Sequence, residues 1–198
     1  LRQYLGIRKI KVGHTGTLDP LATGLIILCT GKATKQILHF QDMDKEYEAV
    51  IRTGATTPSF DLETSIDRHY PWEHITREEV GRALDRFTGK QEQVPPVFSA
   101  KSVDGKRAYD MARKGQEIVL KPHPIEIYSL ELLQFVPPEI RLKISCSKGT
   151  YIRSLARDIG FCLGSGAHLS GLRRTRIGPH HVDQSISIEK FLENLKPL

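Results

Sequence analysis

The stretch from Gly13 to Pro20, Gly-His-Thr-Gly-Thr-Leu-Asp-Pro, is the part of the chain best suited to chemistry. It presents one imidazole, His14, and one carboxylate, Asp19, among glycines that permit unusual backbone angles. Because proline disfavours helical geometry at the residue before it, we expect Asp19 to lie on a loop. A carboxylate on a rigid turn suits nucleophilic or acid–base catalysis, although the same pattern is typical of an ordinary Asp-Pro turn.

Other catalytic patterns are not found in the sequence. Asp19 has no second carboxylate at close spacing, which disfavours a glycosidase pair and a two-metal site. The glycine-rich loops typical of nucleotide binding do not occur. Cys29, Cys146 and Cys162 lie far apart in apolar surroundings, so we expect buried, reduced thiols in a cytoplasmic protein and no metal site.

Charge is distributed unevenly along the chain, whose net charge is +6. Residues 141–178 contain eight basic residues and one acidic residue, and residues 1–35 contain six basic residues and one acidic residue. The stretch 36–140 is acidic, with 13 basic and 18 acidic residues. Such segregation favours a polyanion bound on one face, so a nucleic acid is the expected partner. No apolar run approaches the roughly 18 residues of a membrane span, and no membrane partner is expected.

The elements that must position these residues are several strands and a few helices. Apolar runs and alternation predict strands at 22–29, 45–53, 125–136 and 139–147, the last two joined as a hairpin. Helical spacing predicts helices at 76–87, 108–113, 151–163 and 187–195, with an irregular loop at 93–100. Together they indicate a single α+β domain over residues 1–198, with a mixed, largely antiparallel central sheet flanked by helices and loops.

Three of these helices carry specific expectations. The helix at 76–87 begins with a capping box formed by Thr76 and Glu79. Arg153 and Arg157 share one face of the helix at 151–163 because they are four residues apart. The last helix is expected to bury an apolar stripe made of Ile188, Phe191, Leu192 and Leu195.

Five blocks of sequence, in the same order, resemble those of the bacterial TruB-type tRNA pseudouridine synthases. The blocks are Gly13–Gly24, Lys45–Tyr47, Gln93–Lys101 with Gly105–Arg113, Lys148–Asp158 and Leu172–Gly178. Each block is moderately specific, and together they are highly specific and span nearly the whole chain. The resemblance implies a pseudouridine synthase fold with a central catalytic cleft.

The resemblance also implies a reaction. Uridine 55 in the T-loop of tRNA would be flipped out, its N1–C1′ bond broken, and C5 joined to C1′ to give pseudouridine. Asp19 would be the catalytic carboxylate, and attack at C1′, addition at C6 and deprotonation at C2′ are all open as its step. Because an isomerisation involves no net redox change, neither a metal nor an organic cofactor is implied.

Arg153 and Tyr47 are the other two catalytic residues that the resemblance implies. Arg153 would pair with Asp19 and keep the carboxylate ionised and oriented. Tyr47 would stack on the flipped uracil near C5, where a proton must leave.

The implied substrate-binding residues surround this centre. Tyr151 and Leu172 would wall the uracil pocket and exclude water. His14 would occupy the space that the flipped uridine vacates. Phosphate contacts are implied for Lys101, Arg173, Arg174 and Arg176.

The chain departs from the family pattern in three places. The family's N-terminal Lys-Pro-x-Gly segment is absent, so one RNA-contacting lysine and a piece of the sheet are expected to be missing. Many bacterial members read Thr-Asp-Thr-x-Asp where this chain reads Thr57-Pro-Ser-Phe-Asp61. The chain also ends at Leu198, without the separate C-terminal RNA-binding domain of many relatives.

These features favour a stand-alone cytoplasmic monomer that acts on the T-arm of tRNA. Two alternatives are a non-catalytic RNA-folding factor and a guide-RNA-dependent pseudouridine synthase subunit. The intact Asp19, Tyr47 and Arg153 argue against a purely non-catalytic role. Leu21-Ala-Thr-Gly directly after the Asp-Pro, together with the missing C-terminal domain, favours the stand-alone form over the guide-dependent one.

Overall fold

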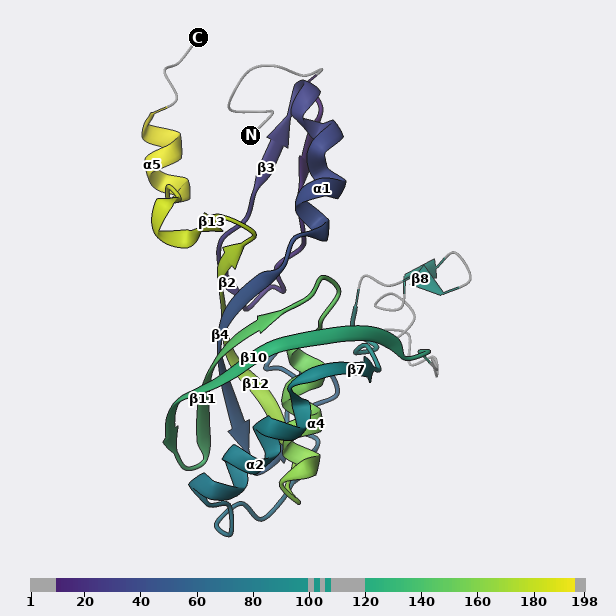
Figure 1. Cartoon of the computed structure of the whole chain (residues 1–198), viewed down its shortest axis with the longest axis vertical. Helices are drawn as coiled ribbons and strands as arrows, with labels where there is room; N and C mark the ends of the chain where they lie inside the picture. Colours follow the sequence, from purple (N-terminus) through teal and green to yellow (C-terminus); the bar gives the residue numbers. More distant parts are fainter. Residues whose placement is uncertain (1–9, 100–101, 104–105, 108–119, 195–198) are drawn as a thin grey trace.

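A seven-stranded sheet organises the computed structural model, which describes residues 10–99, 102–103, 106–107 and 120–194 (Figure 1). Its strand order is β13-β12-β4-β11-β10-β7, with β2 pairing in parallel beside β12 and all other neighbours antiparallel. The prediction of a mixed, largely antiparallel sheet is confirmed. The strands are β2 Thr23–Gly24, β4 Lys45–Thr53, β7 Gly89–Gln93, β10 His123–Val136, β11 Glu139–Cys146, β12 Ala167–Ile177 and β13 His180–His181.

The centre of the sheet follows the alternation of its sequence. Strand β4 has the predicted bounds, and its residues Ala49 and Ile51 are buried while Glu48 is exposed. The predicted hairpin is confirmed as β10 and β11, which pair from Ile127 and Cys146 down to Val136 and Glu139. Because successive side chains point to opposite faces of a strand, one face of the sheet is apolar and the other is charged.

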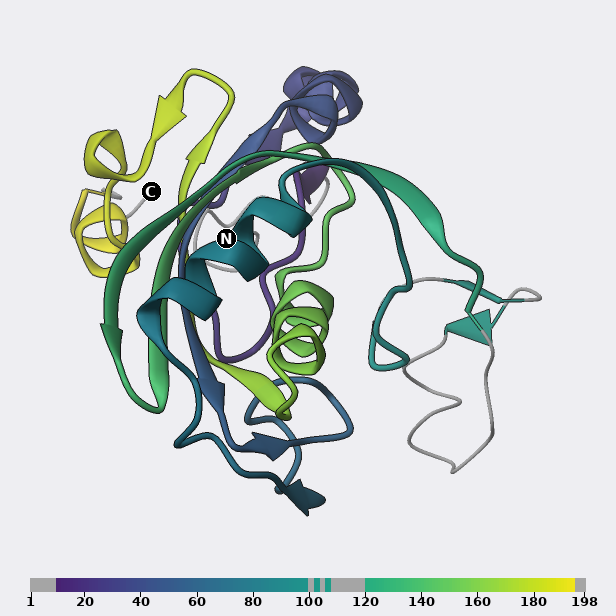
Figure 2. The same ribbon diagram turned by 60° about the horizontal axis from the view of Figure 1, so that its bottom comes forward.

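Two helices cover the apolar face, α2 Arg77–Phe87 and α4 Ile152–Cys162 (Figure 2). Helix α2 begins with the predicted capping box, in which Thr76 and Glu79 satisfy each other's backbone N–H groups. Leu84 of α2 and Leu155 and Ile159 of α4 pack into one core with the buried strand residues. Burial of this apolar area stabilises the fold at about 25 cal/mol per Å² and holds α4 firmly against the sheet.

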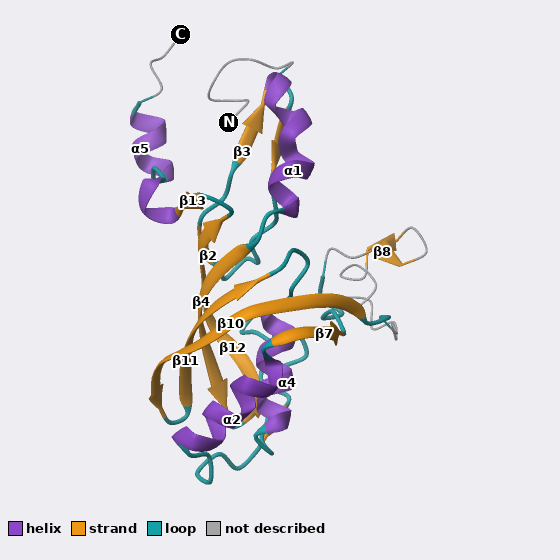
Figure 3. Cartoon of the chain, viewed as in Figure 1, coloured by secondary structure: helices purple, strands orange, loops and turns teal. Residues whose placement is uncertain are grey.

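Part of the chain before β4 extends beyond the central sheet (Figure 3). Strands β1 Val12–His14 and β3 Leu28–Thr30 pair with each other, and the short helices η1 Gly31–Gln36 and α1 Ile37–Asp42 follow. The prediction of one buried strand at 22–29 is wrong. The backbone N–H of Leu25 donates to Arg174 O at 2.8 Å, which divides the run into β2 and β3 and leaves Ile26 exposed.

The end of the chain also differs from expectation. Helix α5 spans only Ile188–Glu193, and Ile188 is 74% exposed, so the predicted buried stripe is wrong. Phe191 and Leu192 are only partly buried, and Leu195 lies outside the described residues. The other short elements are β5 Ala55–Thr56, β6 Arg68–His69, β8 Ser102–Val103, β9 Lys106–Arg107 and η2 Val182–Gln184.

Two further sequence predictions concern cysteines and membranes. Cys29 and Cys146 are buried as predicted, whereas Cys162 is only partly buried because it lies near the end of α4. No helix in the described part of the chain is long and apolar enough to cross a membrane. The predicted helix at 108–113 lies outside the described residues.

Candidate active site

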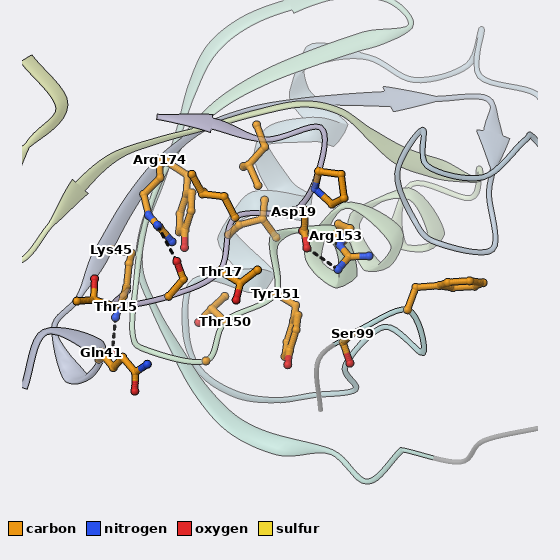
Figure 4. Close-up of a pocket in the computed structure, with 18 of the residues that line it drawn as sticks. Thr15, Thr17, Asp19, Gln41, Lys45, Ser99, Thr150, Tyr151, Arg153 and Arg174 are labelled. Atoms are coloured by element: carbon orange, nitrogen blue, oxygen red, sulfur yellow. Dashed lines mark hydrogen bonds and ion pairs between the residues drawn. The ribbon is translucent and has the colours of Figure 1, made fainter. Parts of the chain in front are cut away.

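One cavity of about 660 Å³ collects most of the predicted site residues (Figure 4). The loop that follows β1 forms one wall, β4 and β12 form the floor, and the N-terminal end of α4 closes another side. Its lining includes six predicted site residues, namely Asp19, Tyr47, Tyr151, Arg153, Leu172 and Arg174. Residues up to 155 positions apart in the sequence, Asp19 and Arg174, therefore meet at one place.

The centre of the cavity is a two-point contact between Asp19 and Arg153. Arg153 Nη2 donates to Asp19 Oδ1 at 2.8 Å, and Nε lies 2.8 Å from Oδ2. The Arg153 side chain is 4% exposed, whereas the Asp19 side chain is 34% exposed. The hydrogen bond from Nη2 and the ion pair at Nε together hold the carboxylate beside the guanidinium. Asp19 is therefore oriented by a buried partner while one side stays accessible from the cavity.

A loop between β5 and β6 also contacts the Arg153 guanidinium. Arg153 Nη1 donates to the backbone carbonyl of Ser59 at 3.2 Å, and Nε lies 3.6 Å from Asp61 Oδ2. The Asp61 side chain is 5% exposed and also accepts a hydrogen bond from the N–H of Glu63. The sequence reasoning did not include Asp61 in the site. Its match to the last acid of the family's Thr-Asp-Thr-x-Asp segment was the available signal.

The environment of Asp19 raises the pKa of its carboxyl above the ordinary value of 3.8. Burial is the largest cause, because a charged carboxylate loses hydration in the cavity. The positive charge and hydrogen bond of Arg153 lower the pKa, while the charges of Asp61 and Glu63 raise it. Arg153 thus offsets only part of the effect of burial.

Arg174 fixes the backbone of the loop that carries Asp19. Its side chain is buried, and it donates from Nε to Leu25 O at 2.8 Å and from Nη2 to Gly16 O at 3.1 Å. Gly16 has a φ of 145°, and at Gly24 a Cβ would lie 2.2 Å from Arg174 O. The glycines of the motif are therefore needed for backbone conformation and for close approach to β12.

Tyr47 lies on the cavity face of β4 and packs against the hydrophobic core. Burial raises the pKa of its phenol to about 12, and the nearby Arg174 opposes this shift through its charge and a hydrogen bond. The hydroxyl is therefore protonated at neutral pH. It can donate a hydrogen bond, but it is not available as a phenolate base.

Tyr151, at the N-cap of α4, is held in the cavity wall through its backbone. The buried Gln93 at the end of β7 accepts from the Tyr151 N–H at 2.8 Å and donates to the Tyr151 carbonyl at 3.1 Å. His123 packs edge-on against the ring, with centroids 5.9 Å apart. Because Tyr151 precedes Arg153 by two residues, these contacts also set where α4 begins.

Lys45 lines the cavity and is another residue that sequence reasoning did not include in the site. It begins β4, is buried, and its ammonium donates to the carbonyls of Gln41 and Met43 at the end of α1. Burial and the charge of Arg174 lower the pKa of Lys45. Its position two residues before Tyr47, in the Lys-Glu-Tyr block, was a signal that it shares the cavity face of the strand.

The remaining predicted binding residues are not among those that line the cavity. His14 is exposed on β1, and Lys101 lies outside the described residues. Arg173 is exposed on the charged face of the sheet, where its strand register places it opposite Glu48. Arg176 donates to Gly178 O at 2.9 Å and lies 3.9 Å from Glu46.

The three predicted phosphate-binding arginines of β12, Arg173, Arg174 and Arg176, do not form one cluster in the structure. Neighbouring residues of a strand point to opposite faces, so Arg173 and Arg174 cannot share one surface. The geometry does not favour a phosphate contact by Arg174, because its buried guanidinium already donates to two loop carbonyls. The role it has in the structure is to hold the Asp19 loop.

Solved structures with the same fold include chains from two larger complexes. A chain in a crystal structure of a Cbf5-Nop10-Gar1 complex superposes with a TM-score of 0.73 at 27% identity, covering 97% of this chain and 47% of its own length. A chain from an H/ACA RNP bound to a substrate RNA containing 2′-deoxyuridine gives a TM-score of 0.70 at 24% identity, with 97% and 46% coverage, a likeness of fold alone.

Sequence comparisons give the family. The model for the TruB family pseudouridylate synthase (N terminal domain) matches residues 2–152, and that for the tRNA pseudouridylate synthase B C-terminal domain matches residues 153–196. Proteins called tRNA pseudouridine synthase B from Phocaeicola vulgatus and Bacteroides fragilis are 62% and 60% identical, over 96% and 94% of this chain and 80% of each relative. The one from Flavobacterium johnsoniae is 48% identical, over 96% and 82%. The chain belongs to the TruB family of pseudouridylate synthases.

Proposed function

We propose that this protein isomerises uridine 55 in the T-loop of tRNA to pseudouridine, with Asp19 as the catalytic carboxylate. The observation that carries the proposal is the Asp19–Arg153 contact at the centre of the cavity. Relatives called tRNA pseudouridine synthase B, at 58–62% identity over most of the chain, support tRNA as the substrate. That the protein works as a cytoplasmic monomer stays a prediction from the sequence.

The reaction keeps every atom of the nucleotide. The N1–C1′ bond breaks, C5 forms the new bond to C1′, the proton on C5 leaves and N1 gains a proton. Asp19 is the accessible anion at this point, and each of its three possible steps needs the ionised form. Arg153 stabilises that form and fixes its plane.

The cavity walls suit a flipped base. Tyr47 and Leu172 present apolar surface from the sheet, and Tyr151 does so from the start of α4. Enclosure by these side chains would exclude water from a reactive intermediate. Because the Tyr47 hydroxyl is protonated at neutral pH, its proposed role is to stack on the base and to donate a hydrogen bond. Tyr47 could accept the C5 proton only if its own hydroxyl proton passed to another acceptor.

The deciding experiment compares Asp19→Asn with the wild type on a tRNA transcript carrying tritium at C5 of uridine. The variant is expected to bind the transcript with wild-type affinity and to release no tritium, because an amide can neither attack nor accept the proton. Tritium release by the variant at the wild-type rate would contradict the assignment.

Two controls separate catalysis from general effects. Asp85→Asn changes an exposed carboxylate of α2 that does not line the cavity, and it should leave tritium release unchanged. A transcript with cytidine in place of uridine 55 should release no tritium above background from that site. Undiminished release from this transcript would place the modified uridine elsewhere.

A further inference from the structure

The loop from Thr57 to Asp61 determines how Arg153 is presented to Asp19. It supplies two further contacts to the guanidinium, from Nη1 to the Ser59 carbonyl at 3.2 Å and from Nε to the Asp61 carboxylate at 3.6 Å. A rotation of this loop would move both contacts together. The direction in which Arg153 points therefore depends on what fixes the loop.

The backbone of this loop is tied at both ends. Thr57 Oγ1 donates to Asp61 O at 2.6 Å, and Ser59 Oγ donates to the same carbonyl at 3.2 Å. The N–H of Leu169 on β12 donates to Phe60 O at 2.9 Å. These bonds force a tight turn whose centre is Phe60.

Phe60 adopts a backbone conformation that residues other than glycine rarely adopt. Its φ is 63°, and it is the one residue other than glycine with positive φ in the described part of the chain. A bulky side chain in this region is strained, and such strain persists only where surrounding contacts impose it. Glycine or asparagine would satisfy the backbone better, so the phenyl ring itself must contribute something here.

Arg157 of α4 supplies the contact that holds the ring. Its guanidinium carbon lies 4.8 Å from the centroid of the Phe60 ring, within the range of a cation–π interaction. Asp158 fixes the guanidinium in turn, accepting a hydrogen bond from Arg157 Nε at 2.7 Å. Arg153 and Arg157 lie one helical turn apart on the same face of α4. From this face Arg153 contacts the backbone of the loop and Arg157 contacts the Phe60 ring.

We propose that Phe60 is a positioning residue for the isomerisation: its ring, held by Arg157, keeps the loop in the conformation that directs Arg153 at Asp19. The inference rests on the proposed function of Asp19. It does not place Phe60 or Arg157 in contact with the RNA, since neither lines the cavity. The sequence Thr57-Pro-Ser-Phe-Asp61, which departs from the Thr-Asp-Thr-x-Asp of many bacterial members, thereby gains a role.

The first test separates the ring from the backbone. Phe60→Gly removes the ring but adopts positive φ freely, whereas Phe60→Trp keeps an aromatic face for Arg157. Phe60→Gly is expected to lower kcat for tritium release between about tenfold and about 100-fold, with KM for tRNA unchanged, because a misdirected catalytic group costs rate more than binding. Phe60→Trp should retain most of kcat. Wild-type kcat in Phe60→Gly, or an equal loss in both variants, would overturn the proposal.

The second test leaves the loop sequence intact. Arg157→Met removes the cation, and Arg157→Lys restores one over the ring. Arg68→Met is the matched control, because Arg68 lies 4.9 Å from the centroid of the Tyr70 ring in a cation–π pair outside the cavity. We expect a loss of kcat in Arg157→Met, partial rescue in Arg157→Lys and no loss in Arg68→Met. Equal effects of Arg157→Met and Arg68→Met would show a general structural role and reject the proposal.

The pH dependence of kcat/KM distinguishes a positioning role of Phe60 from a purely structural one, because loss of a structural role would not change the pKa of Asp19. Arg153 lowers the pKa of Asp19, so a misdirected Arg153 should shift the acidic limb of kcat/KM to higher pH in Phe60→Gly and Arg157→Met. An unshifted limb in both variants would count against the proposal. Asp19→Asn is measured in the same assay, and activity in that variant would reject the proposed function of Asp19. If Asp19→Asn is inactive but Phe60→Gly has wild-type kinetics, only the positioning role of Phe60 is rejected.

Discussion

At the scale of single residues, the site consists of one accessible carboxylate bound by one buried guanidinium. Asp19 is useful because its partner is fixed: Arg153 is almost fully buried and contacts Ser59 and Asp61 as well. Breaking a buried, charge-assisted contact on one side leaves an uncompensated charge, which is far more costly than losing an exposed ion pair. The arrangement therefore holds the carboxylate in one orientation.

The raised pKa of Asp19 leads to a pH-dependence prediction. The reaction needs the ionised carboxylate, and burial favours the neutral acid, so activity should fall as the pH drops through a pKa above 3.8. The acidic limb of kcat/KM on free enzyme, measured by tritium release, reports this pKa. A limb at or below 3.8 would mean that the attraction of Arg153 exceeds the effect of burial.

At the scale of elements, β12 directs side chains to both faces of the sheet. Leu172 and Arg174 face the cavity while Arg173 faces solvent, and irregularities of register occur on both sides of this stretch. Such irregularities re-aim side chains next to active sites. The strand therefore works as a scaffold for the Asp19 loop through Arg174, and not as a uniform basic strip.

Adjacent arginines of β12 give a matched pair of variants. Arg174→Met should destabilise the fold by several kcal/mol, because it leaves the carbonyls of Gly16 and Leu25 without their donors at about 1–3 kcal/mol each. Arg173→Met changes an exposed side chain and should stay within about 0.5 kcal/mol of wild type. Urea unfolding of both variants measures the difference. Equal stabilities would show that water can replace the guanidinium of Arg174.

At the scale of the whole molecule, a curved sheet carries α2 and α4 on one face (Figure 2). Strands β4 and β12 and the start of α4 line the cavity. The segments matched by the two family models share this sheet, since β12 from the second pairs with β4 from the first. In the proposed function, the net charge of +6 attracts the polyanionic tRNA to the molecule, and the cavity binds one flipped base. Shape and a splayed base are the usual means by which proteins recognise structured RNA.

Charge at this scale predicts a salt effect on binding. Phosphate contacts release counterions, so the affinity for tRNA should fall steeply between about 50 mM and about 200 mM salt. Fluorescence anisotropy with labelled tRNA measures the slope, and Asp19→Asn should give the same slope because Asp19 contacts no phosphate in the proposed complex. An affinity independent of salt would assign the basic residues to some other role.

Much of the fold follows from local pattern. The strand at 45–53, the hairpin at Pro137-Pro138 and the capping box of α2 were predictable because alternation, turn residues and capping are properties of neighbouring residues. The actual structure at 22–29 and the exposed face of α5 could not be predicted in this way. Leu25 is bound by a strand about 150 residues away, and Ile188 of α5 is 74% exposed.

The sequence by itself predicted the family and the pairing of Arg153 with Asp19, because residue types in an ordered set of motifs carry that information. It also named Asp19 as the proposed catalytic carboxylate. Only the tertiary structure decided which arginine of the Arg173-Arg174 pair faces the cavity, that Asp61 is the second carboxylate at Arg153, and that Phe60 lies under Arg157. These are contacts between segments far apart in the chain. Their geometry depends on strand register and helix packing, which no local spacing specifies.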